Sequence, residues 1–124
     1  MLYLIVDGDD IGRKITSYFI TNDEARLTRI STDMTTAVGA ISVVLQESGF
    51  RVFFCAADGV VAANPNQVDA EKLFERVRSL APEGITFSAG TGETLQQAYV
   101  ALMQAKCSGK NRHLDYGSLN SAKK

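Results

Sequence analysis

The chain opens with an unbroken apolar run that stops at a cluster of acids. Residues 2–6 are all apolar and include β-branched and aromatic types, a pattern typical of a central strand covered on both faces. Asp7, Asp9 and Asp10 follow at once. Because buried ionised carboxylates need water, hydrogen-bond donors or a cation, we expect the strand to end in a polar cleft. The alternative is local: Asp9 or Asp10 caps the next helix, and Asp7 is a solvated strand end.

Helical periodicity occupies the next part of the chain. Ile11, Ile15 and Phe19 recur every four residues, which predicts a helix that begins directly after the acids and runs to about Ile20. After a short polar break, a second and longer helix is expected to run to about Ser48. We expect its apolar stripe to pack in the core. The stripe consists of Leu27, Ile30, Met34, Ala37, Val38, Ile41, Val44 and Leu45.

An aspartate-glycine pair lies between two strand-like runs in the middle of the chain. Residues 51–57 and 60–63 have strand-like composition, and only Asp58 and Gly59 separate them. Such a pair is a strong signal of a β-hairpin, because glycine readily adopts a positive φ at the turn. Asp58 would then lie at a strand end, as Asp7 does. In a purely structural interpretation, Asp58 is no more than a preferred turn residue.

The last part of the chain predicts helix, strand and helix. We expect a third helix at residues 69–80 and a strand at residues 85–90, where apolar and polar residues alternate. A fourth helix is expected between Thr94, which begins a capping box, and Gly109. Three cations follow near its end, where the helix dipole alone would also favour them. They are Lys106, Lys110 and Arg112.

The predicted order is strand, helix, helix, strand, strand, helix, strand, helix, which indicates an α/β fold with a central mixed or antiparallel sheet. We expect a single domain over residues 1–116, followed by a disordered tail at residues 117–124. Because sheet ends carry sites, the fold would bring Asp7 and Asp58 together from distant parts of the sequence.

Composition narrows the possible functions. The 124 residues carry a net charge of −1, so we expect no general binding of DNA or RNA. No apolar run approaches the roughly 18 residues of a membrane span, and the start lacks a signal-peptide pattern. We therefore expect a cytoplasmic protein without a membrane partner. Cys55 and Cys107 lack metal-ligand spacing and are interpreted as core-type thiols. The single histidine, His113, is interpreted as incidental.

The acids outline a site for two divalent metal ions. Carboxylate oxygens suit Mg²⁺ or Mn²⁺, which keep several waters and bind substrate phosphates. Two such ions could activate an attacking hydroxyl and stabilise a leaving pyrophosphate. The N-terminus of the first predicted helix, with Gly8 and Gly12 beside it, would offer backbone N–H groups to a triphosphate. The lysines at the end of the last helix would neutralise charge opposite.

Three short motifs carry a resemblance to known proteins. They are Asp7-Gly8-Asp9, then Ala56-Ala57-Asp58-Gly59, and finally Ala-Lys-Cys-Ser-Gly-Lys-Asn-Arg at residues 105–112. Together with the element order they resemble the palm domain of GGDEF-type diguanylate cyclases, class III nucleotidyl cyclases and the polymerase-like large subunit of type III CRISPR complexes. The resemblance covers roughly residues 2–112. The chain is most similar to the minimal CRISPR polymerases, stand-alone palm proteins of bacterial defence loci.

The resemblance implies a ferredoxin-like palm fold and a metal-dependent nucleotidyltransferase that makes a cyclic di- or oligonucleotide, with pyrophosphate release, in anti-phage defence. Asp7 and Asp58 would be catalytic and hold the metal, with the Gly8 carbonyl as a further ligand. The nucleotide-binding residues would be Gly8, Asp9, Asp10, Ile11, Gly12, Lys106, Lys110 and Arg112. A separate effector would read the product. Because each palm binds one triphosphate, a cyclic dinucleotide requires two sites face to face, so we expect a homodimer.

The chain departs from the family motifs in several places. Ala-Ala replaces Gly-Gly before Asp58, and Gly59 stands where many relatives have a second acid, so one metal site is poorer than the family norm. Lys110 replaces an arginine and loses its planar fork. GGDEF enzymes read guanine with an asparagine in the helix after the first strand, where this chain has Ile15. We therefore expect ATP as substrate and cyclic di-adenylate as product.

Two other interpretations compete with catalysis. A palm with a weakened metal site could bind nucleotide without turnover and act as a sensor. A response-regulator receiver also has early acids, a mid-chain aspartate and a late lysine, and would use Asp58 as phosphoacceptor. The receiver fits less well, because a receiver alternates strand and helix throughout, whereas two helical patterns follow each other here before any second strand.

Overall fold

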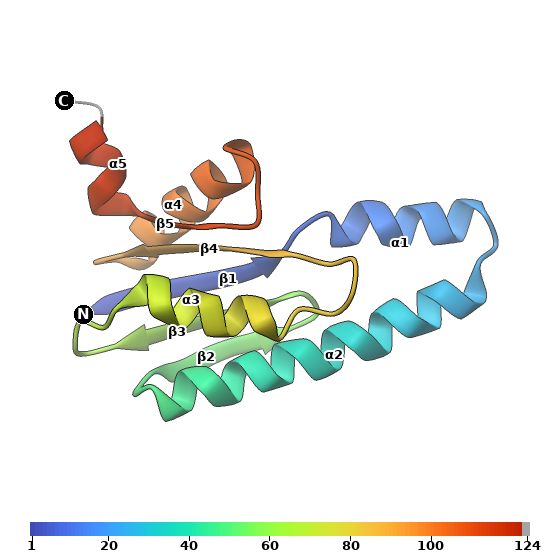
Figure 1. Cartoon of the computed structure of the whole chain (residues 1–124), viewed down its shortest axis with the longest axis horizontal. Helices are drawn as coiled ribbons and strands as arrows, with labels where there is room; N and C mark the ends of the chain where they lie inside the picture. The colour runs from blue at the N-terminus through green and yellow to red at the C-terminus, as the bar shows by residue number, and fades with distance from the viewer. Residues whose placement is uncertain (123–124) are drawn as a thin grey trace.

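A five-stranded sheet in the order β2-β3-β1-β4-β5 organises the computed structural model, which describes residues 1–122 (Figure 1). The central strand β1 is antiparallel to both β3 and β4, β2 is antiparallel to β3, and β5 is parallel to β4. The first four strands have the ferredoxin-like order, so the predicted palm fold is confirmed. The strands are β1 (Leu2–Gly8), β2 (Arg51–Ala56), β3 (Gly59–Asn64), β4 (Phe87–Gly92) and β5 (His113–Asp115).

Helices cover the two faces of this sheet unequally. Figure 1 shows α2 and α3 over one face and α4 behind the other, while α1 and the start of α2 form an arm beyond the end of the sheet. No helix within residues 1–122 is both long and apolar enough to cross a membrane. The helices are α1 (Ile11–Ile20), α2 (Glu24–Glu47), α3 (Ala70–Ser79), α4 (Leu95–Cys107) and α5 (Tyr116–Ala122).

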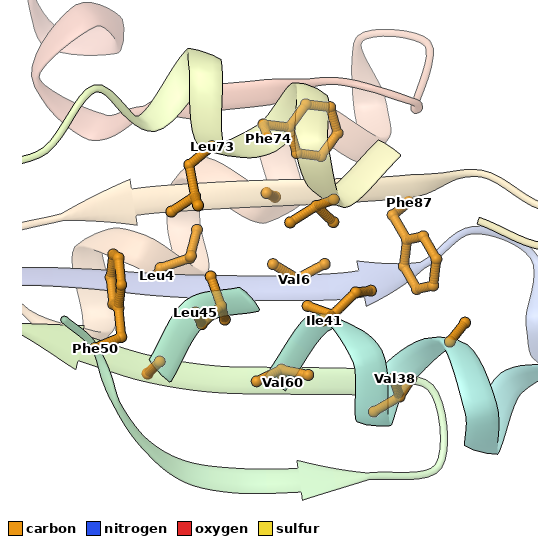
Figure 2. Packing of buried hydrophobic residues seen from close by; sticks show 14 of the residues in the cluster. Leu4, Val6, Val38, Ile41, Leu45, Phe50, Val60, Leu73, Phe74 and Phe87 are labelled. Atoms are coloured by element: carbon orange, nitrogen blue, oxygen red, sulfur yellow. The ribbon is translucent and has the colours of Figure 1, made fainter. Parts of the chain in front are cut away.

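The core lies between the sheet and the pair α2 and α3 (Figure 2). Alternate residues of β1 point into it, because successive side chains of a strand face opposite ways. Val6 and Val60 there meet the α2 residues Ile41 and Leu45, all at most 1% exposed. The predicted apolar stripe of α2 is thus confirmed from Ile30 onward, whereas Leu27 lies outside the core. Other core side chains labelled in Figure 2 are Leu4, Val38, Phe50, Leu73, Phe74 and Phe87.

Helix α4 lies unusually close to the opposite face of the sheet. A Cβ added to Gly90 would stand 2.2 Å from the carbonyl oxygen of Ala98 and from the amide nitrogen of Leu102. Only glycine therefore permits this contact between β4 and the helix. Small helix residues complete the contact, since Ala98, Ala101 and Ala105 are fully buried. As a result α4 covers β4 and β1 and leaves β2 and β3 uncovered on this face.

Three sequence expectations are wrong, and one strand was not predicted. Cys55 and Cys107 are exposed, although both were expected in the core. His113 is not incidental, because its ring is buried in β5 between the Thr91 hydroxyl and the Glu71 carboxylate. Strand β5 was not predicted, because its three residues are too few to show a strand period. Residues 117–122 belong to α5 and are not a disordered tail; the remaining tail residues, 123–124, lie outside the described part.

Candidate active site

The sheet brings Asp7 and Asp58 together at one end. Asp7 pairs with Gly59 in the ladder between β1 and β3, and the Gly8 amide donates a 2.8 Å hydrogen bond to the Asp58 carbonyl. Both acids line a hollow of about 360 Å³ beside Tyr99 of α4. Two carboxylates that lie 51 positions apart in the printed sequence therefore share one cleft. The Asp-Gly pair correctly predicted a hairpin here, but the expected turn is wrong: the turn residues are Ala57 and Asp58, Ala57 has the positive φ of 44°, and Gly59 already pairs with Asp7 in β3.

Lys106 stands at the centre of the acid cluster. Its ammonium lies 3.0 Å from Asp7 Oδ2, 3.1 Å from Asp9 Oδ1 and 3.1 Å from the Gly8 carbonyl oxygen. The three donors of the ammonium group thus have three acceptors. Burial alone would lower the pKa of Lys106, but the hydrogen bonds and charges of the two aspartates outweigh it and raise that pKa. Lys106 therefore remains a cation inside the cleft.

The pKa of the Asp7 carboxyl is raised by its surroundings. Burial raises the pKa of the Asp7 carboxyl, and the neighbouring charges of Asp58 and Asp9 act in the same direction. The hydrogen bond from Lys106 lowers the pKa but does not offset the burial. Lys106 has two carboxylate partners, Asp7 and Asp9, so their combined effect on its pKa outweighs burial. Asp7 shares this one lysine with Asp9, so burial outweighs the hydrogen bond and the pKa of Asp7 is raised. The cluster is consequently well suited to a further cation.

The Asp9 side chain faces the protein interior and connects the segments that form the site. Its carboxylate, 2% exposed, accepts hydrogen bonds from Thr86 Oγ1 at 2.7 Å, Ser88 Oγ at 2.8 Å and the Asn111 amide at 3.0 Å. With Lys106 as a fourth donor, the carboxylate joins β1 to β4 and to the segment after α4. The Asp9 amide also donates within the chain, to the Thr86 carbonyl. The geometry therefore gives Asp9 a positioning role in place of the expected contact with nucleotide.

The basic residues that follow α4 lie against the start of α1. Lys110 Nζ is 2.5 Å from Asp10 Oδ1, and this hydrogen bond lowers the pKa of Asp10. Asp10, Lys110 and Asn111 all have positive φ, so two tight turns hold the pair in place. The Arg112 guanidinium donates to the Lys110 carbonyl at 3.0 Å and lies exposed. Of the predicted phosphate-binding residues, Lys110 thus lies at the N-terminus of α1.

An apolar groove of about 440 Å³ leads from Asp58 along the arm formed by α1 and α2. Its only ionisable lining group is Asp58, and two hydroxyls, those of Ser31 and Thr35, line its α2 side. This groove was not predicted from the sequence, although two hydroxyl residues spaced i, i+4 beside an apolar stripe were a usable signal. The groove is lined by Ile11, Gly12, Ile15, Leu27, Ile30, Ser31, Met34, Thr35, Ala57 and Asp58.

The donor set fits a divalent metal only in part. Within residues 1–122 no group of three or more His, Cys, Asp or Glu side chains is arranged to hold an ion. The available oxygens are the carboxylates of Asp7 and Asp58 and the carbonyl of Gly8, and Lys106 contacts two of these three groups. Mg²⁺ commonly uses one or two carboxylates and completes its shell with water and substrate phosphates. The residues therefore fit an ion that arrives with a triphosphate.

Solved structures of cyclase domains are similar to this chain. One is the GGDEF domain of DgcB from Caulobacter crescentus in complex with c-di-GMP, with a TM-score of 0.66, 13% identity, and coverage of 94% of this chain and 77% of that one. Another is the active GGEEF domain of a diguanylate cyclase from Vibrio cholerae, with a TM-score of 0.63, 14% identity, and coverage of 93% and 81%. At these identities the likeness establishes the fold. The antiparallel hairpin around Asp58 also rules out the receiver interpretation.

The family of the chain follows from its sequence. No curated protein matches it. The minimal CRISPR polymerase domain, mCpol, matches residues 3–116, which is nearly the whole chain and includes all three motifs of the cleft. The chain therefore belongs to the minimal CRISPR polymerase family and is an enzyme of the nucleotidyltransferase and nucleotide cyclase type.

Proposed function

We propose that this enzyme joins two ATP molecules into cyclic di-adenylate with release of pyrophosphate, as a homodimer in anti-phage defence. The observation that carries this proposal is the position of Asp58. It lies where the acid cleft meets an apolar groove large enough for a base. A triphosphate can therefore place its base in the groove and its phosphates at the acids, which is the arrangement that a nucleotidyl transfer needs.

The groove favours adenine over guanine. The ring N–H and amino group of guanine are best matched together by a carboxylate or an amide oxygen. Apart from Asp58, which belongs to the acid cleft, the groove has neither, and Ile15 and Leu27 offer only apolar contacts. The hydroxyls of Ser31 and Thr35 can accept from or donate to the amino group and ring nitrogens of adenine. Thr35 already donates to the Ser31 carbonyl, so its oxygen remains free to accept. These contacts support ATP as the substrate.

The chain's own residues position the phosphates. Helix α1 begins at Ile11, directly after Asp9 and Asp10, and the Asp10 side chain does not cap its first amides. Such a helix N-terminus attracts anions. Lys110 can exchange Asp10 for a phosphate, because that pair is partly exposed and exposed ion pairs are weak. Lys106 is held more firmly by its three acceptors. We assign it to the phosphate nearest the acids.

Asp7, Asp58 and the Gly8 carbonyl would hold Mg²⁺ or Mn²⁺. Such an ion supplies charge neutralisation at the phosphates and a lower pKa for a bound hydroxyl. In the reaction, a ribose hydroxyl of one ATP attacks the α-phosphorus of the other. The new P–O bond replaces the bond to the β-phosphate, pyrophosphate leaves, and the hydroxyl proton passes to solvent. A second identical step closes the ring.

The first test is incubation of the protein with each of the four ribonucleoside triphosphates and Mg²⁺ or Mn²⁺, followed by mass spectrometry of the products. We expect cyclic di-adenylate and pyrophosphate from ATP, and no product from Asp58→Ala. Glu47→Ala removes an exposed acid at the end of α2 and serves as the control with unchanged activity. ATP binding without any product would favour the sensor interpretation. A product from GTP alone would contradict the proposed substrate.

A further inference from the structure

Half of one sheet face carries exposed aromatic and aliphatic side chains. Phe53 and Phe54 of β2 are 40% and 57% exposed, and Leu95 and Tyr99 of α4 are 46% and 54% exposed. Together with Ile5 they border an open hollow of about 620 Å³ that has no charged lining residue. An uncharged hollow of this size on a surface is typical of a contact site.

A β-bulge places both phenylalanines on this face. The pairing of β2 with β3 shifts between Val52 and Phe54, so one residue of β2 has no partner. Phe54 lies opposite Val61 and therefore shares its face. The ring of Phe53 lies 6.5 Å from that of Tyr3, which belongs to the same face of β1. In an unbulged strand, two successive side chains would point to opposite faces.

We propose that a second copy of this chain covers this face, with its own α4 packed on β2 and β3. The inference rests on the proposed function, because closing a cyclic dinucleotide requires two active sites. The patch is continuous with the site. Ile5, Phe54, Val61 and Tyr99 border both the open hollow and the hollow that reaches Asp7 and Asp58.

The shape of the face selects one arrangement of the two copies. A two-fold axis parallel to the strands exchanges the half covered by α4 with the uncovered half, so each α4 fills the space beside the other. The same axis keeps the acid ends of both sheets at the same end, where the two sites face each other. An axis across the strands would set α4 against α4. It would also separate the two sites by about the length of a strand, roughly 20 Å.

The exposed area agrees with such a contact. An aromatic side chain offers roughly 150–250 Å² of surface, so the four exposed side chains leave on the order of 400 Å² open. That is the size of the largest apolar patch on a typical monomer. A stable interface buries about 800 Å² on each partner. The polar rim, which includes Gln96, would supply the remainder.

Sedimentation velocity at micromolar concentrations tests the surface. We expect wild-type protein to be dimeric, and Phe54→Glu and Tyr99→Arg each to raise the dissociation constant at least about tenfold. Val43→Glu is the matched control, because Val43 is 52% exposed on α2, which covers the other face. Unchanged melting temperatures and circular dichroism spectra would show that the variants fold.

Mixing the two variants gives a sharper test. In the proposed arrangement, Glu at position 54 of one copy meets Arg at position 99 of the other, while the second contact keeps the native Phe54 and Tyr99. We therefore expect the mixture to form a heterodimer and to recover product formation. A monomeric wild type, or variants that stay dimeric, would contradict the assignment of this surface as the dimer interface. A dimer that depends on this surface but makes no product would overturn the proposed function and leave the surface standing.

Discussion

Gly59 lies directly against the Asp7 carboxylate. A Cβ at position 59 would stand 3.1 Å from Asp7 Oδ1 and 2.8 Å from the carbonyl oxygen of Val6. The hairpin therefore has no room for a side chain immediately after Asp58 unless β1 moves. The close approach of β1 therefore requires glycine at the position that follows Asp58. Asp58 is thus the one acid that this hairpin turn brings to the cleft.

Substitution of Gly59 is expected to destabilise the protein. Gly59→Ala should lower the free energy of unfolding by roughly 1–3 kcal/mol, because the added methyl group must displace backbone atoms of β1. Gly39→Ala is the matched control. No atom lies within 4 Å of a Cβ at this exposed position inside α2, so we expect a gain of about 0.5–1 kcal/mol. Urea denaturation of both variants measures the difference. Equal stability of Gly59→Ala and wild type would contradict the close contact.

Asp9 should contribute more to stability than any other acid of the cluster. Asp9→Ala removes the acceptor of Lys106, Thr86, Ser88 and the Asn111 amide. Lys106 keeps Asp7 and the Gly8 carbonyl as acceptors, but the loss of the acceptor for Thr86, Ser88 and the Asn111 amide should cost roughly 3 kcal/mol in denaturant titration.

The control for Asp9 is Asp10→Asn. Its carboxylate is partly exposed and its ion pair with Lys110 is weak for that reason, and asparagine tolerates the positive φ of this position, so we expect almost no change in unfolding free energy. Similar losses for the two variants would show that Asp9 is not the support of the cleft.

The pH dependence of stability should reveal that the ionised Asp7 carboxylate is unfavourably buried. Its pKa is raised in the folded chain because of burial. Such a carboxyl contributes stability below its ordinary pKa of 3.8, and this contribution is lost as the pH rises through the raised value. Asp7→Asn should therefore melt at a higher temperature than wild type at pH 7. The difference in melting temperature between the variant and wild type should shrink as the pH falls toward 3.8. A difference that does not change with pH would show that burial of the Asp7 charge is not its cause.

Metal binding provides an independent test of the same acids. Mg²⁺ together with an ATP analogue that cannot release pyrophosphate should raise the wild-type melting temperature. Ligands present at about 100 times their dissociation constant stabilise by about 2.7 kcal/mol. Asp7→Asn and Asp58→Asn should lose the part of this shift that depends on Mg²⁺. If both variants respond to Mg²⁺ as wild type does, neither carboxylate is a ligand.

Most of the fold was predictable because its elements are long and strongly patterned. The bounds of α1 follow from its periodicity. The Asp-Gly pair indicated the hairpin, although the turn lies one residue earlier, at Ala57 and Asp58. Strand β5 has only three residues, and its position depends on pairing with β4, to which the local sequence gives no clue. The bulge at Phe53 was equally hidden, since an extra residue in a strand changes only the long-range register.

Within the cleft, the sequence indicated which residue types gather but not which way each one faces. Asp7, Asp9 and Asp10 look alike as a cluster, yet Asp7 faces the cleft, Asp9 the interior and Asp10 the solvent. The difference depends on partners far along the chain. The Asp9 carboxylate accepts from Thr86 and Ser88, which are 77 and 79 positions away. No local pattern encodes that contact.

The last prediction concerns the choice of base. Ile15 lines the groove beside Asp58, so Ile15→Asn adds a donor and an acceptor where the chain now offers only apolar contact. A hydrogen-bonding pair to a base edge is worth about 1–3 kcal/mol. We therefore expect the ratio of kcat/KM for ATP to that for GTP to fall about tenfold. Ile20→Asn, on the same helix but 76% exposed and outside the groove, should leave the ratio unchanged. If both variants keep the wild-type ratio, the groove between α1 and α2 is not where the base binds.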